Sequence, residues 1–511
     1  MNEDLPVLVP GSIAGGRVGF ARRLRPIALV ACVAMGAASV SMGCKSNKGT
    51  QENSESSGAS AGQGGQGGEA GSAASLCPED QGGAAGSSDQ GDAGESSAPE
   101  LTIDWDLNGV VGTGQSLAVG QFGTPAEATT QPYDNLKLDT GTADWPIDPE
   151  DPSFELVPLT EPIGRPSTSY PSSYPTNIAG ETPHAAMANQ ITALVSNANG
   201  PDFVGVHGEF GENGQCIGFL EKDTTPTTVN GRAYKATLLE TEAITRLAEA
   251  QGKSYGVGAV IVTHGECDAG NTNYEADLYQ LWSDYNTDIP AITGQTRDLL
   301  MIVSQQNSVN SRSASTLAQW KIGVDYPDQI VCSGPKYQYP YYPGDHVHLV
   351  TAGYEQLGEK YGQIYFERVV LGRPWQPLQP TRAERTGDRL ITVQFHVPVP
   401  PLVWETAFQP PYQSVDTWKA GRGFEVRGPS SRIQIDSVEI CGDSVVIACG
   451  SDLPETGVTV GYAMTGESEA MSTPFEGTFR WGLLRDSDPF VGSTTHTPQP
   501  NYAVAFEMPV L

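Results

Sequence analysis

Residues 257–268 read VGAVIVTHGECD, and this stretch does most to decide the fold. The apolar run 257–262 lacks the polar alternation of a half-exposed strand, so we predict a strand buried on both faces. The largely polar residues 263–268 follow at once and stand at the end of that strand. Polar side chains packed at a strand end are typical of a functional site, and a satisfied turn is the alternative.

The same pattern recurs on both sides of this strand. Further apolar runs that predict strands occupy residues 107–111, 203–206, 299–304 and 329–332. Two helical faces lie between them, formed by Leu239, Ala243, Leu247 and Ala250 and by Leu278, Trp282 and Tyr285, and a further helix is expected at 351–370. Strands alternating with amphipathic helices predict a three-layer α/β/α fold around a parallel sheet. Functional residues are then expected beyond the carboxyl ends of the strands.

Residues 112–116, GTGQS, directly follow the first predicted strand. A serine on a glycine-rich turn presents its hydroxyl among free backbone N–H groups, as a nucleophile in acyl transfer requires. Gly-Ser turns without such a role are common, so this segment decides nothing by itself.

Residues 345–349, DHVHL, stand directly before the predicted helix at 351–370. Asp345, three residues before His348, can place its carboxylate against one ring nitrogen and leave the other for a serine. His346 has the wrong spacing for this role. The alternative is that Asp345 begins the helix and both histidines lie at the surface.

In chain order, the segments GQS, HGExD and DxVHL resemble the motifs of the sialate O-acetylesterase-like branch of the SGNH (GDSL-type) hydrolases. That branch carries a Gly-Gln-Ser-Asn motif, a Gln-Gly-Glu motif and a late Asp-x-x-His. Leu117 stands here in place of the Asn, and His264 in place of the Gln. The resemblance covers about residues 101–374 and implies a flavodoxin-like three-layer core, in agreement with the strand and helix pattern.

The resemblance implies hydrolysis of O-acetyl esters on glycans through an acyl-enzyme. Ser116 would be the nucleophile, His348 the base that takes its proton, and Asp345 the carboxylate that orients the imidazole. Such a reaction requires no metal and no cofactor. The expected partner is an acetylated oligo- or polysaccharide, with sialic acid and xylan among the open choices.

The resemblance also implies a set of donors for the oxyanion. These would be the N–H groups of Ser116 and Gly214, with Gly211 as the second choice for the latter, and the imidazole of His264. The residues expected to support the surrounding loop are Gln115, Glu266 and Asp268.

Three other features bear on the site. The segment 207–209, HGE, echoes the second motif at an earlier strand end, where loop structure is the favoured interpretation. A cluster of tyrosines before Asp345 can offer a stacking surface for a sugar or can simply pack the loop: Tyr337, Tyr339, Tyr341 and Tyr342. The Pro-rich segment 121–182 is long for a loop and is expected to shape or cover a substrate cleft.

From residue 376 onward, the sequence pattern changes to predicted β-strands divided by turns. Predicted strands occupy 390–399, 423–426, 432–440, 444–449, 457–463 and 502–506. This pattern is typical of a β-sandwich over residues 376–511, following an esterase-like domain at 101–375. The sandwich would either bind carbohydrate or only pack against the first domain.

The N-terminal segment has the features of an export signal followed by a tether. Basic residues precede an apolar run at 26–43, which predicts an export signal over residues 1–43. A single membrane anchor is the alternative, although the run is short for one. The sequence Ser-Met-Gly before Cys44 resembles a bacterial lipobox, which implies lipidation of Cys44 and a membrane partner. Residues 44–100 are rich in Gly and Ser and predict a disordered tether.

Charge and cysteine content fit an exported protein. The net charge of −31, from 29 basic and 60 acidic residues, argues against nucleic acid as a partner. Outside the signal and Cys44, six cysteines allow fifteen pairings, and we predict none; Cys441 and Cys449 are not expected to face each other. A surface-tethered glycan-binding or adhesion protein with a non-catalytic SGNH fold is the competing function. An esterase for long acyl chains ranks below both.

Overall fold

The structure is a computed structural model. It describes residues 75–77, 100–168, 172–223, 230–306, 312–343, 345, 347–408, 418, 420–464 and 482–511. The predicted export signal, the lipidation site Cys44 and most of the predicted tether lie outside these residues, as does His346. None of the helices in the described ranges has the length and apolar character that crossing a membrane requires.

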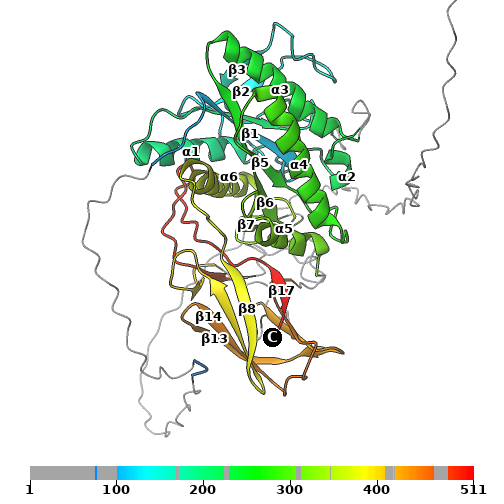
Figure 1. Cartoon of the computed structure of the whole chain (residues 1–511), viewed down its shortest axis with the longest axis vertical. Coiled ribbons are helices and arrows are strands. Elements are labelled where there is room, and N and C mark those ends of the chain that lie inside the picture. The colour runs from blue at the N-terminus through cyan, green and yellow to red at the C-terminus, as the bar shows by residue number, and fades with distance from the viewer. Residues whose placement is uncertain are drawn as a thin grey trace, which may run out of the picture. The chain divides into compact units, whose positions relative to one another are not determined.

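A seven-stranded sheet forms the centre of the α/β part (Figure 1). Its order is β3-β2-β4-β1-β5-β6-β7, and every pairing is parallel except that of β2 with β3. The strands are β1 Leu107–Gly114, β2 Leu136–Asp139, β3 Glu155–Pro158, β4 Gly205–Glu209, β5 Tyr255–Thr263, β6 Leu300–Gln305 and β7 Ile330–Pro335. Without the β2–β3 hairpin, the strands follow the doubly wound order 2-1-3-4-5.

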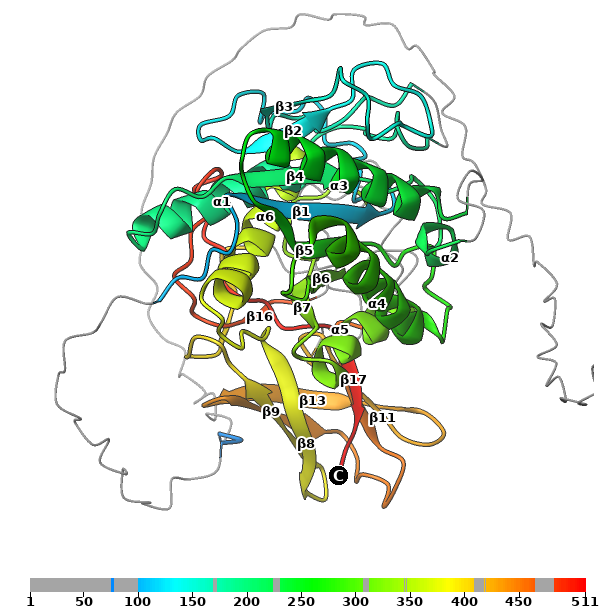
Figure 2. The same cartoon turned by 45° about the horizontal axis from the view of Figure 1, so that its top comes forward.

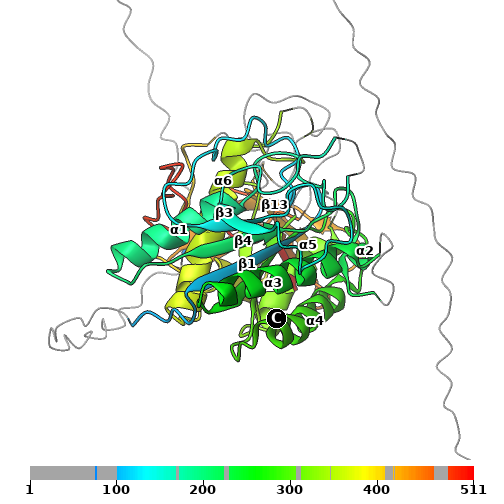
Figure 3. The same cartoon turned by 90° about the horizontal axis from the view of Figure 1, so that it is seen from above.

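Helices cover both faces of this sheet (Figure 3). Along β5, Val260 and Val262 belong to the apolar cluster of α3, α4 and α5, whereas Ala259 and Ile261 belong to the cluster of α1 and α6. The helices are α1 His184–Asn197, α2 Ile217–Leu220, α3 Arg232–Ala250, α4 Tyr274–Thr293, α5 Ala314–Asp325 and α6 Thr351–Tyr365, which continues as the π-helical turn η1 Phe366–Val370. The predicted α/β class with a mostly parallel, doubly covered sheet is confirmed.

The C-terminal part is rich in antiparallel strands, as predicted (Figure 2). One sheet has the order β13-β14-β9-β8 and another β12-β11-β15-β17. The two sheets share a core in which the rings of Phe395 and Phe506 lie 6.0 Å apart. The strands are β8 Gln379–Gly387, β9 Leu390–His396, β11 Phe424–Arg427, β12 Arg432–Ile433, β13 Ile435–Cys441, β14 Ser444–Cys449, β15 Thr459–Tyr462 and β17 Phe506–Pro509, with the separate pair β10 Val403–Trp404 and β16 Leu484–Arg485.

The C-terminal chain returns to the α/β part and binds α6. The buried carboxylate of Glu359 accepts hydrogen bonds from the backbone N–H groups of Thr494 and Thr495 at 2.7 Å each. The neighbouring Lys360, also buried, donates to the Gln499 carbonyl at 2.8 Å. Because α6 begins three residues after His348, these contacts fix the helix that supports the third predicted motif.

A disulfide between Cys77 and Cys441 fixes a short piece of the N-terminal chain to β13. Beside it, the Ser75 hydroxyl donates to the carboxylate of Glu439 at 2.8 Å. Cys441 pairs across the hairpin with Ser444, so it does not face Cys449. The expectation that these two cysteines are not opposite each other is confirmed.

The ends of β1 and β5 approach so closely that only glycine fits at position 114. Gly114 has φ of +149°, and a Cβ there would lie 2.2 Å from the Thr263 carbonyl oxygen. We expect Gly114→Ala to lower the free energy of unfolding by about 2 kcal/mol or more, since backbone would have to move. Urea denaturation measures this, with Gly218→Ala as the control because a Cβ there meets no atom within 4 Å. Equal losses in both variants would contradict the close approach.

Candidate active site

Three predicted side chains form one chain of hydrogen bonds. The Ser116 hydroxyl lies 2.8 Å from Nε2 of His348, and Nδ1 of His348 lies 2.6 Å from Oδ2 of Asp345. Ser116 and His348 are 232 residues apart in the sequence, so the fold alone brings them together. A hydroxyl, an imidazole and a carboxylate in this order can deprotonate the serine as it attacks an electrophilic carbon.

The sheet explains why these residues meet. Ser116 lies in the turn after β1, and the loop that carries Asp345 and His348 follows β7. Strands β1 and β7 both end at the carboxyl edge of the parallel sheet. The strand order reverses between β1 and β5. Ligands of doubly wound sheets bind at such a reversal, so the serine turn lies where a substrate site is expected.

Asp345 is held as a carboxylate. Its Oδ1 accepts hydrogen bonds from the backbone N–H groups of Val347 at 2.9 Å and His348 at 3.1 Å. Partial burial by itself raises the pKa of Asp345, but the hydrogen bond and charge of the His348 ring, with these two N–H groups, outweigh it. The net result is a pKa below the ordinary value, so Asp345 is available to stabilise an imidazolium at neutral pH.

Two aromatic rings hold the imidazole in place, and of these the sequence singled out Tyr342 but not Phe122. The Phe122 ring stacks on Tyr342 at 4.3 Å and meets the His348 ring edge-on at 5.2 Å. The Tyr342 N–H donates to the His348 carbonyl at 2.7 Å. Phe122 adopts φ of +65°, which is uncommon for a bulky residue, and nothing in the local sequence predicts it.

The backbone of Ser116 and Gly214 remains available for an oxyanion. Neither N–H donates to a backbone carbonyl within the described residues. Gly214 is exposed and has φ of +76°, a conformation that suits glycine. The second choice, Gly211, does not qualify, because its N–H donates to the Glu209 carboxylate at 2.6 Å.

The predicted oxyanion role of His264 is wrong. Its side chain is fully buried, and both ring nitrogens already have partners. Nδ1 lies 2.7 Å from the Tyr274 hydroxyl, and Nε2 lies 3.0 Å from the Gln215 carbonyl oxygen. Burial lowers the pKa of His264, which favours the neutral ring. The imidazole therefore holds the chain next to Gly214 instead of facing the Ser116 hydroxyl.

The loop after β5 contacts all the segments that carry the site. The backbone N–H of Cys267 donates to the side-chain oxygen of Gln115, beside the serine, at 3.2 Å. Asp268 accepts the N–H of Ile217 at 2.8 Å. Glu266 forms a buried ion pair with Lys336, at 3.3 Å, in the loop after β7. The residues predicted to support the site, Gln115, Glu266 and Asp268, thus lie where they connect its parts.

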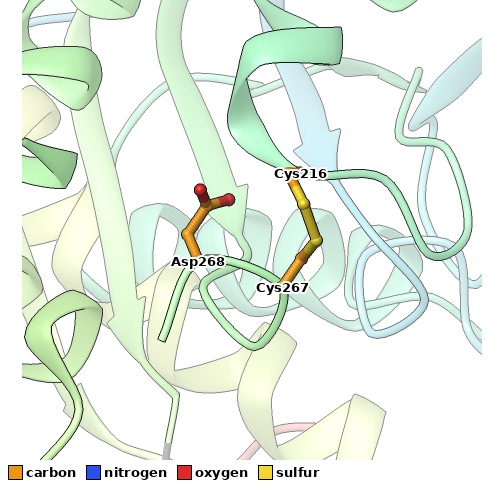
Figure 4. A group of neighbouring side chains, drawn as sticks. All are labelled: Cys216, Cys267 and Asp268. Carbon is orange, nitrogen blue, oxygen red and sulfur yellow. A yellow bond between two sulfur atoms is a disulfide. The ribbon is translucent and has the colours of Figure 1, made fainter. Parts of the chain in front are cut away.

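A disulfide completes this connection. Cys216, at the start of α2, is bonded to Cys267 in the loop after β5, with Asp268 alongside (Figure 4). Within the described residues, these three side chains are the one group whose donor atoms are close enough for a metal ion. Their chemistry does not fit an open metal site, since the two sulfurs are bonded to each other and Asp268 accepts hydrogen bonds from Ile217 and Asn271.

The tyrosines before Asp345 do not form an exposed stacking surface. Tyr337, Tyr339 and Tyr341 are buried, and Tyr342 is covered on one face by Phe122. Packing of the loop is therefore the interpretation that the structure favours for this cluster.

The histidine at the earlier strand end also lies in the interior. The side chains of His207 and Glu209 both bind His184 of α1, at 3.2 Å and 3.1 Å respectively. This network is buried between β4 and the start of α1, and its three side chains offer no exposed group to a substrate.

The segment 121–182 lines a small pocket beside β4. Among the residues around the pocket are Lys137, Arg165, Tyr174 and Glu240. The Tyr174 hydroxyl donates to Glu240 of α3 at 2.5 Å. Burial raises the pKa of Glu240 to about 7, although the bond from Tyr174 and the charge of Arg165 oppose the rise.

The raised pKa of Glu240 predicts a pH-dependent stability. Between about pH 4.5 and 7 the folded chain holds a proton that the unfolded chain has lost, so the free energy of unfolding falls as pH rises through this range. Through this group, the parent chain should lose about 2–3 kcal/mol of its free energy of unfolding between pH 5 and pH 8, and we expect Glu240→Gln to abolish that part of the loss. Urea denaturation at both pH values measures it. Glu242→Gln on the same helix is the control, and an unchanged pH dependence in Glu240→Gln would refute the assignment.

Comparisons with known proteins find similarity only among solved structures. No protein-family model and no curated protein matches the chain. A carbohydrate acetylesterase from Xanthomonas citri is 13% identical, with a TM-score of 0.47, over 78% of this chain and 80% of that one. A protein from Arabidopsis thaliana is 17% identical, with a TM-score of 0.36, over 51% and 98%. NanS is 12% identical, with a TM-score of 0.32, over 52% and 98%. Because identity and TM-score are low in all three cases, the function of this chain has to be judged from its own site.

Proposed function

We propose that this chain is a serine esterase that hydrolyses O-acetyl esters on glycans. The observation that carries the proposal is the hydrogen-bond chain of Ser116, His348 and Asp345, with distances of 2.8 and 2.6 Å. Its place at the carboxyl edge of a sheet with the order 2-1-3-4-5 supports a flavodoxin-like core of the SGNH type.

The geometry implies a two-step reaction. The Ser116 oxygen attacks the acetyl carbonyl carbon while Nε2 of His348 accepts the hydroxyl proton, and Asp345 stabilises the imidazolium. The N–H groups of Ser116 and Gly214 stabilise the negative oxygen of the tetrahedral intermediate. As that intermediate collapses, His348 returns the proton to the departing sugar hydroxyl. Water, deprotonated by the same imidazole, then releases acetate from Ser116.

The choice of glycan esters rests on the motifs. The order GQS, HGExD and DxVHL resembles the sugar-directed branch of the SGNH hydrolases, and this supports acetylated oligo- or polysaccharides over long acyl chains. The competing function is a surface-tethered glycan-binding or adhesion protein without turnover. One observation favours it: both ring nitrogens of His264 are engaged by Tyr274 and Gln215, so one expected oxyanion donor is missing.

Acetate release distinguishes the two functions. Protein lacking residues 1–74, so that Cys77 keeps its disulfide partner, is assayed on acetylated xylan, on O-acetylated sialic acid and on a chromogenic acetyl ester. Release by the parent chain and its loss in His348→Ala, with unchanged thermal unfolding, would support the esterase. A folded parent chain that releases no acetate from any of the three but binds a glycan array would favour the adhesion protein.

We also propose that the chain is exported and anchored through a lipid on Cys44 to the bacterial cell envelope. The signal-like segment 1–43 supports this, as do the two disulfides among the described residues, since such bonds persist in oxidising compartments. Expression with a clickable palmitate analogue tests the anchor. Label in the parent chain and none in Cys44→Ser would support lipidation, whereas equal labelling, or none in either, would exclude it.

A further inference from the structure

We propose that the Cys216–Cys267 disulfide positions the oxyanion donor Gly214, so that turnover requires these two cysteines to be oxidised to the disulfide. The inference rests on the proposed esterase function. It concerns how the loop after β5 holds the chain 214–217 against the turn that carries the nucleophile.

The chain before Gly214 is held by the bonds of the Glu212 N–H to the Gly114 carbonyl, at 3.0 Å, and of Asn213 to Gln121, at 2.7 Å, whereas the chain after it has little local support. Gly214 is exposed, and α2 behind it is only four residues long. The backbone bond that closes its turn is that of the Gln215 N–H to the Glu212 carbonyl, at 3.2 Å. A donor on such a segment needs outside contacts, because oxyanion stabilisation is lost when the donor shifts by about 1 Å.

The loop after β5 supplies those contacts to the three consecutive residues 215–217. His264 holds the Gln215 carbonyl at 3.0 Å, Cys267 is bonded to Cys216, and Asp268 accepts the N–H of Ile217 at 2.8 Å. Figure 4 shows the disulfide spanning from the chain before α2 to this loop. Of these links, only the disulfide is covalent, and it lies two residues from Gly214.

The same loop also contacts the nucleophile turn. The N–H of the bonded Cys267 donates to the side-chain oxygen of Gln115, which directly precedes Ser116. Through this hydrogen bond, the disulfide connects the segment of Gly214 to the turn of Ser116, whose N–H groups are the proposed oxyanion donors. Breaking it leaves the Ser116–His348–Asp345 hydrogen bonds untouched and removes the covalent link that holds Cys216, two residues after Gly214, to the loop after β5.

The bond is placed where a reductant can reach it. Cys267 is exposed and Cys216 is half-buried, whereas the free thiols of Cys332 and Cys449 are buried. A dithiol such as dithiothreitol would donate two electrons and two protons to the sulfur–sulfur bond. The products are two protein thiols, on Cys216 and Cys267, and the oxidised cyclic form of the reductant.

The test compares turnover with the bond intact and broken. In a Cys77→Ser/Cys441→Ser background, which removes the other disulfide of the described residues, protein is reduced with dithiothreitol, and alkylation with iodoacetamide followed by mass spectrometry verifies that Cys216 and Cys267 are reduced. We expect kcat for a chromogenic acetyl ester to fall about 10- to 100-fold, with KM changed little, and reoxidation to restore it. The double variant Cys216→Ser/Cys267→Ser should show the same loss permanently.

A fluorophosphonate probe separates this inference from the proposed function. The probe reacts with an activated serine whatever the natural ester is, and its rate on Ser116 should fall together with kcat. Unchanged kcat and labelling in fully reduced, folded protein would overturn the positioning role and leave the esterase intact. A parent chain that neither releases acetate nor labels at Ser116 would overturn both. Loss of activity only together with loss of cooperative thermal unfolding would identify the disulfide as a global stabiliser and also refute the inference.

Discussion

Replacing Ser116 by alanine is expected to lower kcat/KM for an acetyl ester by at least about 10⁴-fold. The variant removes the hydroxyl that forms the acyl-enzyme in the proposed mechanism, while His348 and Asp345 keep their 2.6 Å contact. The side chain is small, and it loses one hydrogen bond, so the free energy of unfolding should change by no more than about 1 kcal/mol. Initial rates with a chromogenic ester and urea denaturation measure the two effects.

The matched control for this variant is Ser437→Ala, an exposed serine on β13. It should retain the full rate, because β13 belongs to the β-rich part of the chain. Residual activity in Ser116→Ala within about tenfold of the parent chain would mean that another group carries the attack, and the proposed mechanism would then be abandoned.

Asp345→Asn is expected to lower kcat by about 10⁴-fold without unfolding the loop. The asparagine oxygen can still accept the N–H groups of Val347 and His348, so the local backbone is kept. Its amide would then donate to Nδ1 of His348, which forces the ring proton onto Nε2. In that tautomer the imidazole cannot accept the proton of Ser116.

Single-turnover kinetics on the acetyl ester would measure this loss, with Asp443→Asn in the β13–β14 turn as the control. The fluorophosphonate labelling rate of Ser116 should fall in parallel, because it also depends on proton transfer to His348. A normal labelling rate in Asp345→Asn would show that the carboxylate does not control the tautomer.

Strands that are buried on both faces could be predicted from the sequence. The run at 257–263 lies within β5 and that at 299–304 overlaps β6 with a shift of one residue, because continuous apolar strands leave few alternatives. The helix expected at 351–370 corresponds to α6 and η1 together. These elements can be predicted from their own residues, since the apolar pattern of each one follows from the layer that covers it.

Elements that depend on distant contacts could not be predicted. Strands β2 and β3 have four residues each and stand in a Pro-rich stretch, so their pairing and not their composition makes them strands. Helix α1 has no exposed face at its start: its first eight residues are all buried, because α6 and the C-terminal chain cover it. A one-sided periodicity is absent when a helix is enclosed on all sides.

The candidate site divides in the same way. Asp345 and His348 could be paired from their spacing, and Ser116 from its turn, because these features are local. The burial of His264 could not be foreseen, since it depends on Tyr274 of α4 and on Gln215, which both lie outside the motif in the sequence. Likewise, no local pattern connects Cys216 to Cys267 or brings Phe122 against His348.

The Cys77–Cys441 bond has a mechanical consequence for a chain anchored at Cys44, as proposed above. Any pull from the membrane would enter the folded protein at β13 through Cys77, and the residues between 77 and 100 would carry no load. The tether that carries the load then consists of residues 45–76, with a contour length of roughly 110 Å, instead of roughly 190 Å for residues 45–99. The β-rich part would thus bear the strain of attachment, and the loops of Ser116 and His348 would be shielded from force.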